Sequence, residues 1–344
     1  MMKTSKPIYL SDFSNKRSNN LNFLKFVASL AVIISHAYPL SKGEETVDFL
    51  LQVSGQTLGL GGVAVAVFFV SSGFFVSKSI ERKNDTLVYL KARLKRLFPP
   101  LWFMLIVVIL ICAVGFTTLS ISDYFFNTQF LKYCLNFFLI PIHSLPGVFD
   151  NNVYPSVING ALWTLPIEFV CYIVLLVIYK LKLFNKNSYK VFSAIMMLGF
   201  VFIYCIPLPF IVSIRGYMAP FFMFYIGSLF WVYRDQIYIS RKLYYISIFL
   251  LIVLSLVHFG HLALCLSFPY IVIYISFQLP QCGKMLSNLG NYSYGIYLFG
   301  WPIQQMVVSA FGGSMSIALN CFISIPLACL AGILVYNVVE KRIA

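Results

Sequence analysis

Lys25 and His36 are polar side chains within one apolar stretch, residues 21–40, that has the length of a membrane span. They are eleven positions apart. A helix turns by about 100° per residue, so both side chains are predicted to face the same way, roughly 16 Å apart along the axis. Such groups are costly in hydrocarbon and indicate a functional site. The alternatives are that Lys25 snorkels to lipid phosphates and that His36 serves packing or hydrogen bonding.

Glu168 is one of only eleven acidic residues and lies inside another apolar stretch, residues 161–180. Glu168 and His36 are predicted to lie at a similar depth in the membrane, each counted from the outer end of its own stretch. A carboxylate beside an imidazole can orient the ring and hold its proton, which is the arrangement used in general-base catalysis. The alternative is a buried hydrogen bond between helices.

Arg93 and Arg96 form a third candidate cluster, in a basic segment that precedes Pro99 and Pro100. Residues three apart share a helix face, and guanidinium groups bind phosphate oxygens in pairs. The two prolines suit the first turn of the next span, predicted at residues 98–116. By spacing alone, an ordinary membrane anchor would be the better interpretation of the two arginines.

The composition is that of a polytopic membrane protein. The chain is 60% hydrophobic, 17% aromatic and 10% charged, with a mean hydropathy of +0.85, whereas soluble domains carry about 25% charged residues. The prediction is an all-α integral membrane protein with a bundle of about ten transmembrane helices. The predicted spans are residues 21–40, 58–78, 98–116, 161–180, 190–206, 216–233, 243–257, 261–278, 291–311 and 315–337.

The net charge of +14 reports orientation rather than nucleic-acid binding. The predicted spans place the segments between them alternately on the two sides of the membrane. Most of the 25 basic residues fall on one side, and only Lys42, Lys132 and Arg215 fall on the other. Basic residues are enriched in cytoplasmic loops, so both termini are predicted to be cytoplasmic. Anionic lipid or an anionic cytoplasmic substrate is a secondary interpretation of the charge.

Three further segments carry predictions. Residues 79–97 are expected to form a short basic cytoplasmic loop. The external segment 117–160 contains an apolar piece at 131–140 that is too short to cross, so it is expected to be re-entrant or interfacial. Gly73 in the second span is expected to permit close helix packing.

Taken together, these patterns resemble the membrane-bound acyltransferase 3 family. The resemblance rests on five blocks that run in the family's order from residue 21 to about 302, each of them weak alone. They are the Lys25–His36 spacing, Arg93-x-x-Arg96 with the following Pro-Pro-Leu-Trp, Phe-Phe-Val-Ser-Ser-Gly-Phe at 68–74, Trp-Thr-Leu-Pro-Ile-Glu at 163–168 and Tyr-Ser-Tyr-Gly-Ile-Tyr-Leu at 292–298. The chain departs from the family at Gly300, where the family often has histidine.

The resemblance implies transfer of an acyl group, usually acetyl, from cytoplasmic acyl-CoA to a hydroxyl of an envelope carbohydrate, such as O-antigen or exopolysaccharide. The implied domain spans residues 21–340, after a cytoplasmic segment 1–20, in the bacterial inner membrane. Transfer is expected to be completed within this membrane domain, and no metal is expected. The implied roles are catalysis by His36 and Glu168, acetyl-CoA binding by Lys25, Arg93 and Arg96, and binding of the carbohydrate, lipid-linked or free, by Trp163 and Tyr297.

Two other function classes remain open. Ten spans with polar groups near mid-membrane also suit a transporter or flippase for a glycan or lipid-linked substrate, although two related halves with broken spans are not evident. A non-catalytic partner of a polysaccharide assembly complex is the third hypothesis. Binding of acyl-CoA, and its loss when Arg93 or Arg96 is removed, would separate the enzyme from the scaffold.

Overall fold

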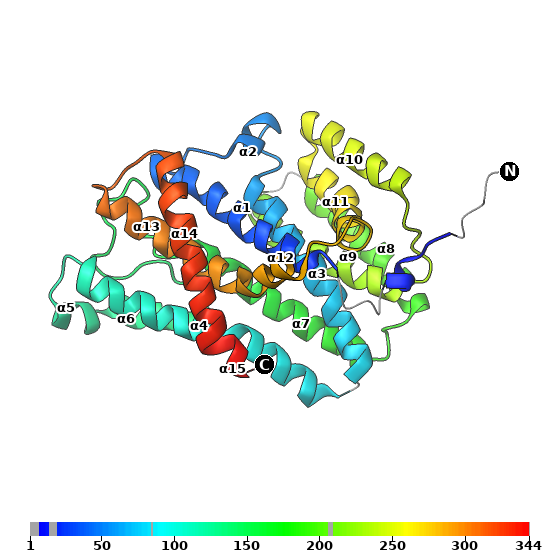
Figure 1. The fold of residues 1–344 in the computed structure, drawn as a ribbon, viewed down its shortest axis with the longest axis horizontal. Helices are drawn as coiled ribbons and strands as arrows, with labels where there is room; N and C mark the ends of the chain where they lie inside the picture. Colours follow the sequence, from blue (N-terminus) through cyan, green and yellow to red (C-terminus); the bar gives the residue numbers. More distant parts are fainter. Residues whose placement is uncertain (1–6, 14–18, 84, 206–208, 344) are drawn as a thin grey trace.

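The computed structural model describes residues 7–13, 19–83, 85–205 and 209–343. Regular structure within these ranges is helical, with two isolated β-bridges between Tyr9 and Tyr238 and between Thr117 and Val148. The predicted all-α class is confirmed. Figure 1 shows the long helices packed side by side, with the short helices α2, α5 and α6 at the periphery.

Ten long α-helices form the body of the molecule. They are α1 (Leu21–Lys42), α3 (Leu60–Lys83), α4 (Thr86–Gly115), α7 (Thr164–Lys180), α8 (Lys186–Cys205), α9 (Pro209–Val232), α10 (Arg241–Leu256), α11 (Gly260–Phe277), α13 (Ser293–Ala310) and α14 (Ile317–Val335). The short helices are α2 (Phe49–Val53), α5 (Ile121–Phe125), α6 (Thr128–Tyr133), α12 (Lys284–Leu289) and α15 (Lys341–Ile343). The 3₁₀ turns are η1 (Leu10–Phe13), η2 (Cys134–Phe138), η3 (Gly160–Trp163) and η4 (Gly290–Tyr292), and η5 (Tyr336–Glu340) is a π-helical turn.

Each of the ten predicted spans coincides with one of these long helices. Seven helical segments of the described chain are long and apolar enough to cross a membrane. The count of ten crossings and the cytoplasmic location of both termini stay predictions. Much of the predicted segment 1–20, position 206 of the fifth span and the side chain of Arg215 lie outside the described part of the chain.

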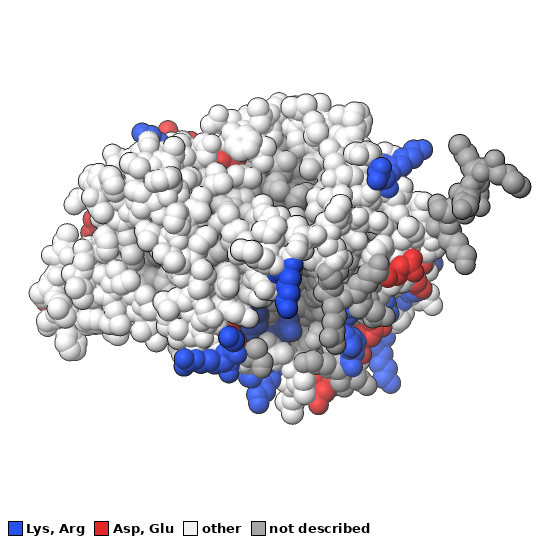
Figure 2. Space-filling model, in the orientation of Figure 1, with Lys and Arg blue, Asp and Glu red and all other residues white. Residues whose placement is uncertain are grey.

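Charged side chains are unevenly distributed over the surface. In Figure 2, Lys and Arg gather on the lower part of the visible face, around the ends of α3 and α4, and most of that face carries neither charge type. A membrane-spanning surface has this character, because hydrocarbon excludes charge and lipid headgroups tolerate it.

The predicted basic loop at residues 79–97 is mostly helical. Helix α3 continues to Lys83, and α4 begins at Thr86, where Asp85 accepts hydrogen bonds from the backbone N–H groups of Leu87 and Val88. Helix α4 then runs through Pro99 and Pro100 without ending. A proline inside a helix removes one backbone hydrogen bond and crowds the carbonyl one turn earlier, which can kink a helix without ending it. The prediction of a loop was therefore wrong, and the Asp85 cap marks the true start of the helix.

The segment 117–160, which is predicted to be external, folds back onto the bundle. Its short elements α5 and η2 pack against α4, α6 packs against α5 and η2, and the indole of Trp102 donates to the carbonyl of Phe137 at 2.9 Å. Phe126 and Phe138 nevertheless leave most of their side-chain area exposed. Large exposed apolar side chains beside a membrane-spanning bundle fit the interfacial placement that the sequence predicts.

Helices α3 and α9 cross with their backbones in close contact. A Cβ atom at Gly73 would overlap the carbonyl oxygen of Phe224, and one at Gly227 would overlap that of Val70. Two glycines facing opposite backbones thus let the helices touch through main-chain atoms, as small residues do in membrane bundles. The packing role predicted for Gly73 is confirmed.

Gly73→Ala should lower the thermal stability of the purified protein by about 1–3 kcal/mol, because the backbones must separate to admit the methyl group. Gly62→Ala is the matched control in the same helix, since nothing lies within 4 Å of its Cβ position. Melting curves of both variants in detergent measure the difference. Equal melting temperatures would contradict the close backbone contact.

Candidate active site

A cavity of about 550 Å³ opens among α1, α3, α4, α7 and α13, on the basic side of the molecule. Five of its lining residues are cationic and two are anionic. The cations are Lys25, Lys91, Arg93, Lys95 and Arg96, and the anions are Glu168 and Glu340. The excess of positive charge is suited to an anionic ligand, because an enclosed site weakens screening by solvent.

Arg93 and Arg96 line this cavity together, as their spacing on one helix face predicts. Arg93 lies over the rings of Tyr89 and Tyr172, at 5.9 and 5.6 Å from their centroids. Its Nε atom is buried and has no hydrogen-bond partner. A guanidinium with a free buried donor is a binding group for an acceptor such as a phosphate oxygen.

Lys25 lines the same cavity from α1. Its Nζ atom lies 5.9 Å from the ring centroid of Phe75, and it lies within electrostatic reach of Arg93, Arg96 and Glu168. The side chain therefore points into the protein, toward the other charges. It does not reach toward lipid, as the alternative interpretation would require.

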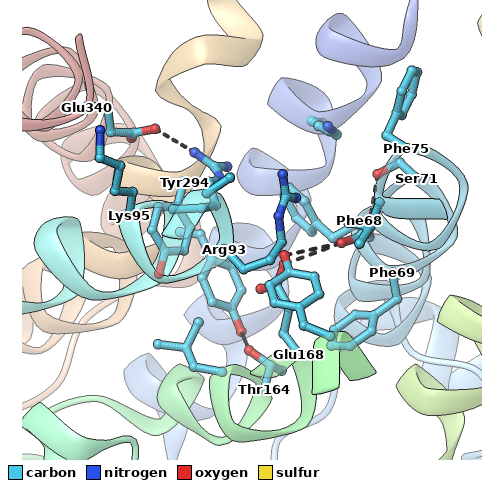
Figure 3. Close-up of a pocket in the computed structure, with 18 of the residues that line it drawn as sticks. Phe68, Phe69, Ser71, Phe75, Arg93, Lys95, Thr164, Glu168, Tyr294 and Glu340 are labelled. Atoms are coloured by element: carbon cyan, nitrogen blue, oxygen red, sulfur yellow. Dashed lines mark hydrogen bonds and ion pairs between the residues drawn. The ribbon is translucent and has the colours of Figure 1, made fainter. Parts of the chain in front are cut away.

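Glu168 projects from α7 into the middle of the cavity wall. Its Oε1 atom accepts hydrogen bonds from Tyr172 and from Ser72, the latter at 3.5 Å. Figure 3 shows Glu168 facing the α3 side chains Phe68 and Ser71, with Arg93 beside it and Lys95, Tyr294 and Glu340 on the opposite side. Glu168 thus belongs to the cation-lined cavity.

The expected pair of Glu168 and His36 is not formed. Nδ1 of His36 is buried without a hydrogen-bond partner, and the bonds of Glu168 go to α3 and to its own helix. The depth of a residue along a helix does not determine which way its side chain points around the helix axis. Helix α7 packs against α9, α3 and α4, whereas α1 packs mainly against α3, α13 and α14, and the carboxylate is bonded to Ser72 of α3 and Tyr172 of α7 rather than to His36 of α1.

His36 contacts an aromatic cluster beyond the inner end of the cavity. Its ring lies edge-on to Trp301, with centroids 4.7 Å apart. Trp301 also contacts Tyr154 at 5.5 Å and donates from Nε1 to the carbonyl of Val157 at 3.2 Å. Packing of this kind fixes the imidazole plane while leaving a ring nitrogen without a protein partner, which suits a base or a nucleophile.

Tyr297 lies where the cavity ends. Its hydroxyl bonds the hydroxyl of Thr164 at 2.7 Å and donates to the carbonyl of Ala161 at 2.8 Å, and Phe68 packs edge-on against its ring. Tyr294, Tyr297 and Trp301 follow one face of α13, over about 10 Å of helix rise. This face leads from the arginines to His36.

Trp163 does not line the cavity. Its ring packs against Tyr217, a half-exposed side chain of α9, at 5.5 Å. Four residues that the sequence analysis did not select make site contacts, namely Ser72, Tyr172, Trp301 and Glu340. Ser72 stands inside the 68–74 block, Trp301 is one helical turn after Tyr297 of the 292–298 block, and Tyr172 is one turn from Glu168, so spacing could have found those three.

The cavity can hold an elongated ligand with an anionic head at the arginines and a neutral arm directed along α13. Among the described residues, no three His, Cys, Asp or Glu side chains lie close enough together to hold a metal ion. The site therefore offers charge, hydroxyl groups and one imidazole as its chemical groups.

These features define a helical, multi-pass membrane protein with a cation-lined internal cavity, and comparison with known proteins gives its class. The acyltransferase 3 family, whose model is described as an acyltransferase domain, matches residues 18–337. The chain belongs to this family and is an acyltransferase.

Two curated relatives are similar in sequence. An O-acetyl transferase of Shigella phage Sf6 is 26% identical over 95% of this chain and 96% of its own length. Nodulation protein 10 of Rhizobium leguminosarum bv. viciae is 26% identical over 55% of this chain and 52% of its own length. No solved structure matches the sequence significantly.

Gly300, the departure from the family pattern, faces α1. A Cβ atom there would lie 2.9 Å from Cγ1 of Ile33, whose side chain is fully buried. Ile33 precedes His36 by about one helical turn. The space that a histidine at position 300 would need is therefore filled by Ile33.

Gly300→His should destabilise the protein by about 1–3 kcal/mol, because the imidazole must displace α1 or Ile33. Adding Ile33→Ala should restore part of this loss, since it removes the clashing side chain. Thermal melting of the two single variants and of the double variant measures the coupling. Additive losses would show that the two positions do not compete for space.

Proposed function

We propose that this protein transfers an acetyl group from cytoplasmic acetyl-CoA to a hydroxyl of an envelope carbohydrate. The observation that carries the donor assignment is the cavity with an excess of cations, in which the buried Nε atom of Arg93 has no partner. The name of the phage relative, an O-acetyl transferase, supports acetyl as the group transferred and oxygen as its destination.

The shape of the donor fits the arrangement of the site. The phosphates of acetyl-CoA would bind Arg93, Arg96 and Lys25 at the basic side. The neutral pantetheine arm, on the order of 15–20 Å when extended, would follow the α13 face past Tyr297. That length matches the roughly 16 Å of helix rise between Lys25 and His36.

His36 is the proposed catalytic residue. In direct transfer it takes the proton of the sugar hydroxyl while that oxygen attacks the thioester carbon, and the C–S bond breaks to release CoA. In stepwise transfer the imidazole attacks first and CoA leaves as its thiolate. The sugar oxygen then displaces the imidazole, which takes the hydroxyl proton and passes it to the thiolate. Glu168 acts on the donor side, where its negative charge lies among the three cations.

The acceptor is proposed to be a carbohydrate at the outer face of a bacterial inner membrane, lipid-linked or free. His36 supports this placement because it contacts Trp301, and Trp301 contacts Tyr154 and Val157 of the external segment. Aromatic side chains such as these offer apolar faces for a sugar ring. Trp163, at the end of η3, where its ring packs against Tyr217 of α9, is a second proposed contact for the acceptor.

His36→Ala should reduce acetylation at least about 100-fold, the usual effect of losing a general base. Binding of acetyl-CoA should persist, because His36 lies outside the cation-lined cavity. The measurement pairs calorimetric binding with mass spectrometry of the acceptor glycan. A folded His36→Ala protein with unchanged acetylation would rule out this catalytic assignment.

Arg93→Ala should weaken acetyl-CoA binding by about tenfold, through loss of a charge-assisted phosphate contact. Arg241→Ala is the matched control, since Arg241 is an exposed arginine outside the cavity. Calorimetry in detergent at low salt compares the two. Equal affinity of Arg93→Ala and wild type would argue for the transporter or scaffold alternatives, in which no donor binds here.

A further inference from the structure

Residues 336–343 cross the mouth of the cavity and are called the strap here. The strap consists of the π-helical turn η5 and the short helix α15. Figure 1 shows it at the end of α14, lying against α4. Glu340 and Ile343 of the strap line the cavity. π-Helical turns are rare and often occur at functional sites.

The strap is held by two contacts to α4. Glu340 forms an ion pair with Arg96 at 2.5 Å, and Nζ of Lys95 donates to the carbonyl of Ile343 at 2.7 Å. The Arg96 guanidinium also lies over the ring of Tyr294, at 4.6 Å from its centroid. The strap therefore depends on the same arginine that the proposed function assigns to the donor phosphates.

The ion pair does not satisfy Glu340 completely. Its side chain is only 13% exposed, and its Oε1 atom is buried without a hydrogen-bond partner. A buried carboxylate oxygen without a donor is costly. The contact with Arg96 is thus weaker than a fully bonded pair, and a ligand with more oxygen atoms in suitable positions can replace it.

We propose that Glu340 is an internal competitor for the donor's phosphate group on Arg96, and that donor binding displaces the strap. A carboxylate and a phosphate oxygen offer the same acceptor chemistry to a guanidinium, so the phosphate of the donor competes with Glu340 for Nη1 of Arg96, the atom that Glu340 occupies. Arg93, with its free Nε, receives the donor first, and Arg96 exchanges Glu340 for phosphate second. Glu340 thereby determines donor affinity. This inference rests on the proposed donor.

The direct test compares CoA binding to full-length wild type and Glu340→Gln in detergent. Glutamine keeps the size of the side chain and removes its charge, so Arg96 is released and CoA should bind about fivefold more tightly. Glu45→Gln, at an exposed glutamate outside the cavity, is the matched control and should bind as wild type does. Equal or weaker binding by Glu340→Gln would overturn the competition.

Hydrogen exchange of the strap gives a second, independent measurement. CoA should increase amide exchange in residues 336–343 of wild type, and Glu340→Gln should show the faster exchange without CoA. If CoA instead protects the strap, then the strap closes over the ligand and the inference is wrong. If folded wild type binds no CoA, the proposed donor fails, and the inference fails with it for that distinct reason.

Discussion

The arrangement of the site depends on the cost of holding like charges together in a poorly solvated space. Lys25, Arg93 and Arg96 converge on one cavity with Glu168 and Glu340 as the carboxylates of its lining. Cation repulsion and desolvation both oppose this arrangement. The protein partly offsets them with the rings of Tyr89, Tyr172 and Tyr294. The remaining positive charge favours the binding of an anionic ligand.

In the proposed function, the cavity binds the donor, His36 carries out the transfer, and α13 joins the two places. Tyr294 touches the guanidinium of Arg96, Tyr297 lines the cavity about one turn further along α13, and Trp301 touches His36. One face of a single helix would therefore set the distance between the phosphates of the donor and the reacting group. The charged part of the donor would stay on the basic side, and only its neutral arm would approach the predicted external segment.

The sequence predicted the features that follow from position along one helix. Helical periodicity fixed the shared face of Arg93 and Arg96, and hydropathy located the ten long helices, because both are properties of single segments. Glu168 and Glu340 show the limit of this reasoning. The direction of Glu168 depends on how α7 packs, and Glu340 pairs with Arg96 across 244 positions of sequence. Such relations arise only from the packed bundle.

The glycine contact between α3 and α9 has a mechanical consequence for the cavity. Backbone packed directly on backbone leaves no side chain whose rotation could absorb a movement, so these two helices must shift together. Ser72 and Phe75 stand on that stiff side. The opposite side ends in one ion pair and one lysine contact. The wall of the cavity can therefore move mainly at the strap. A change in the volume of the cavity would occur there.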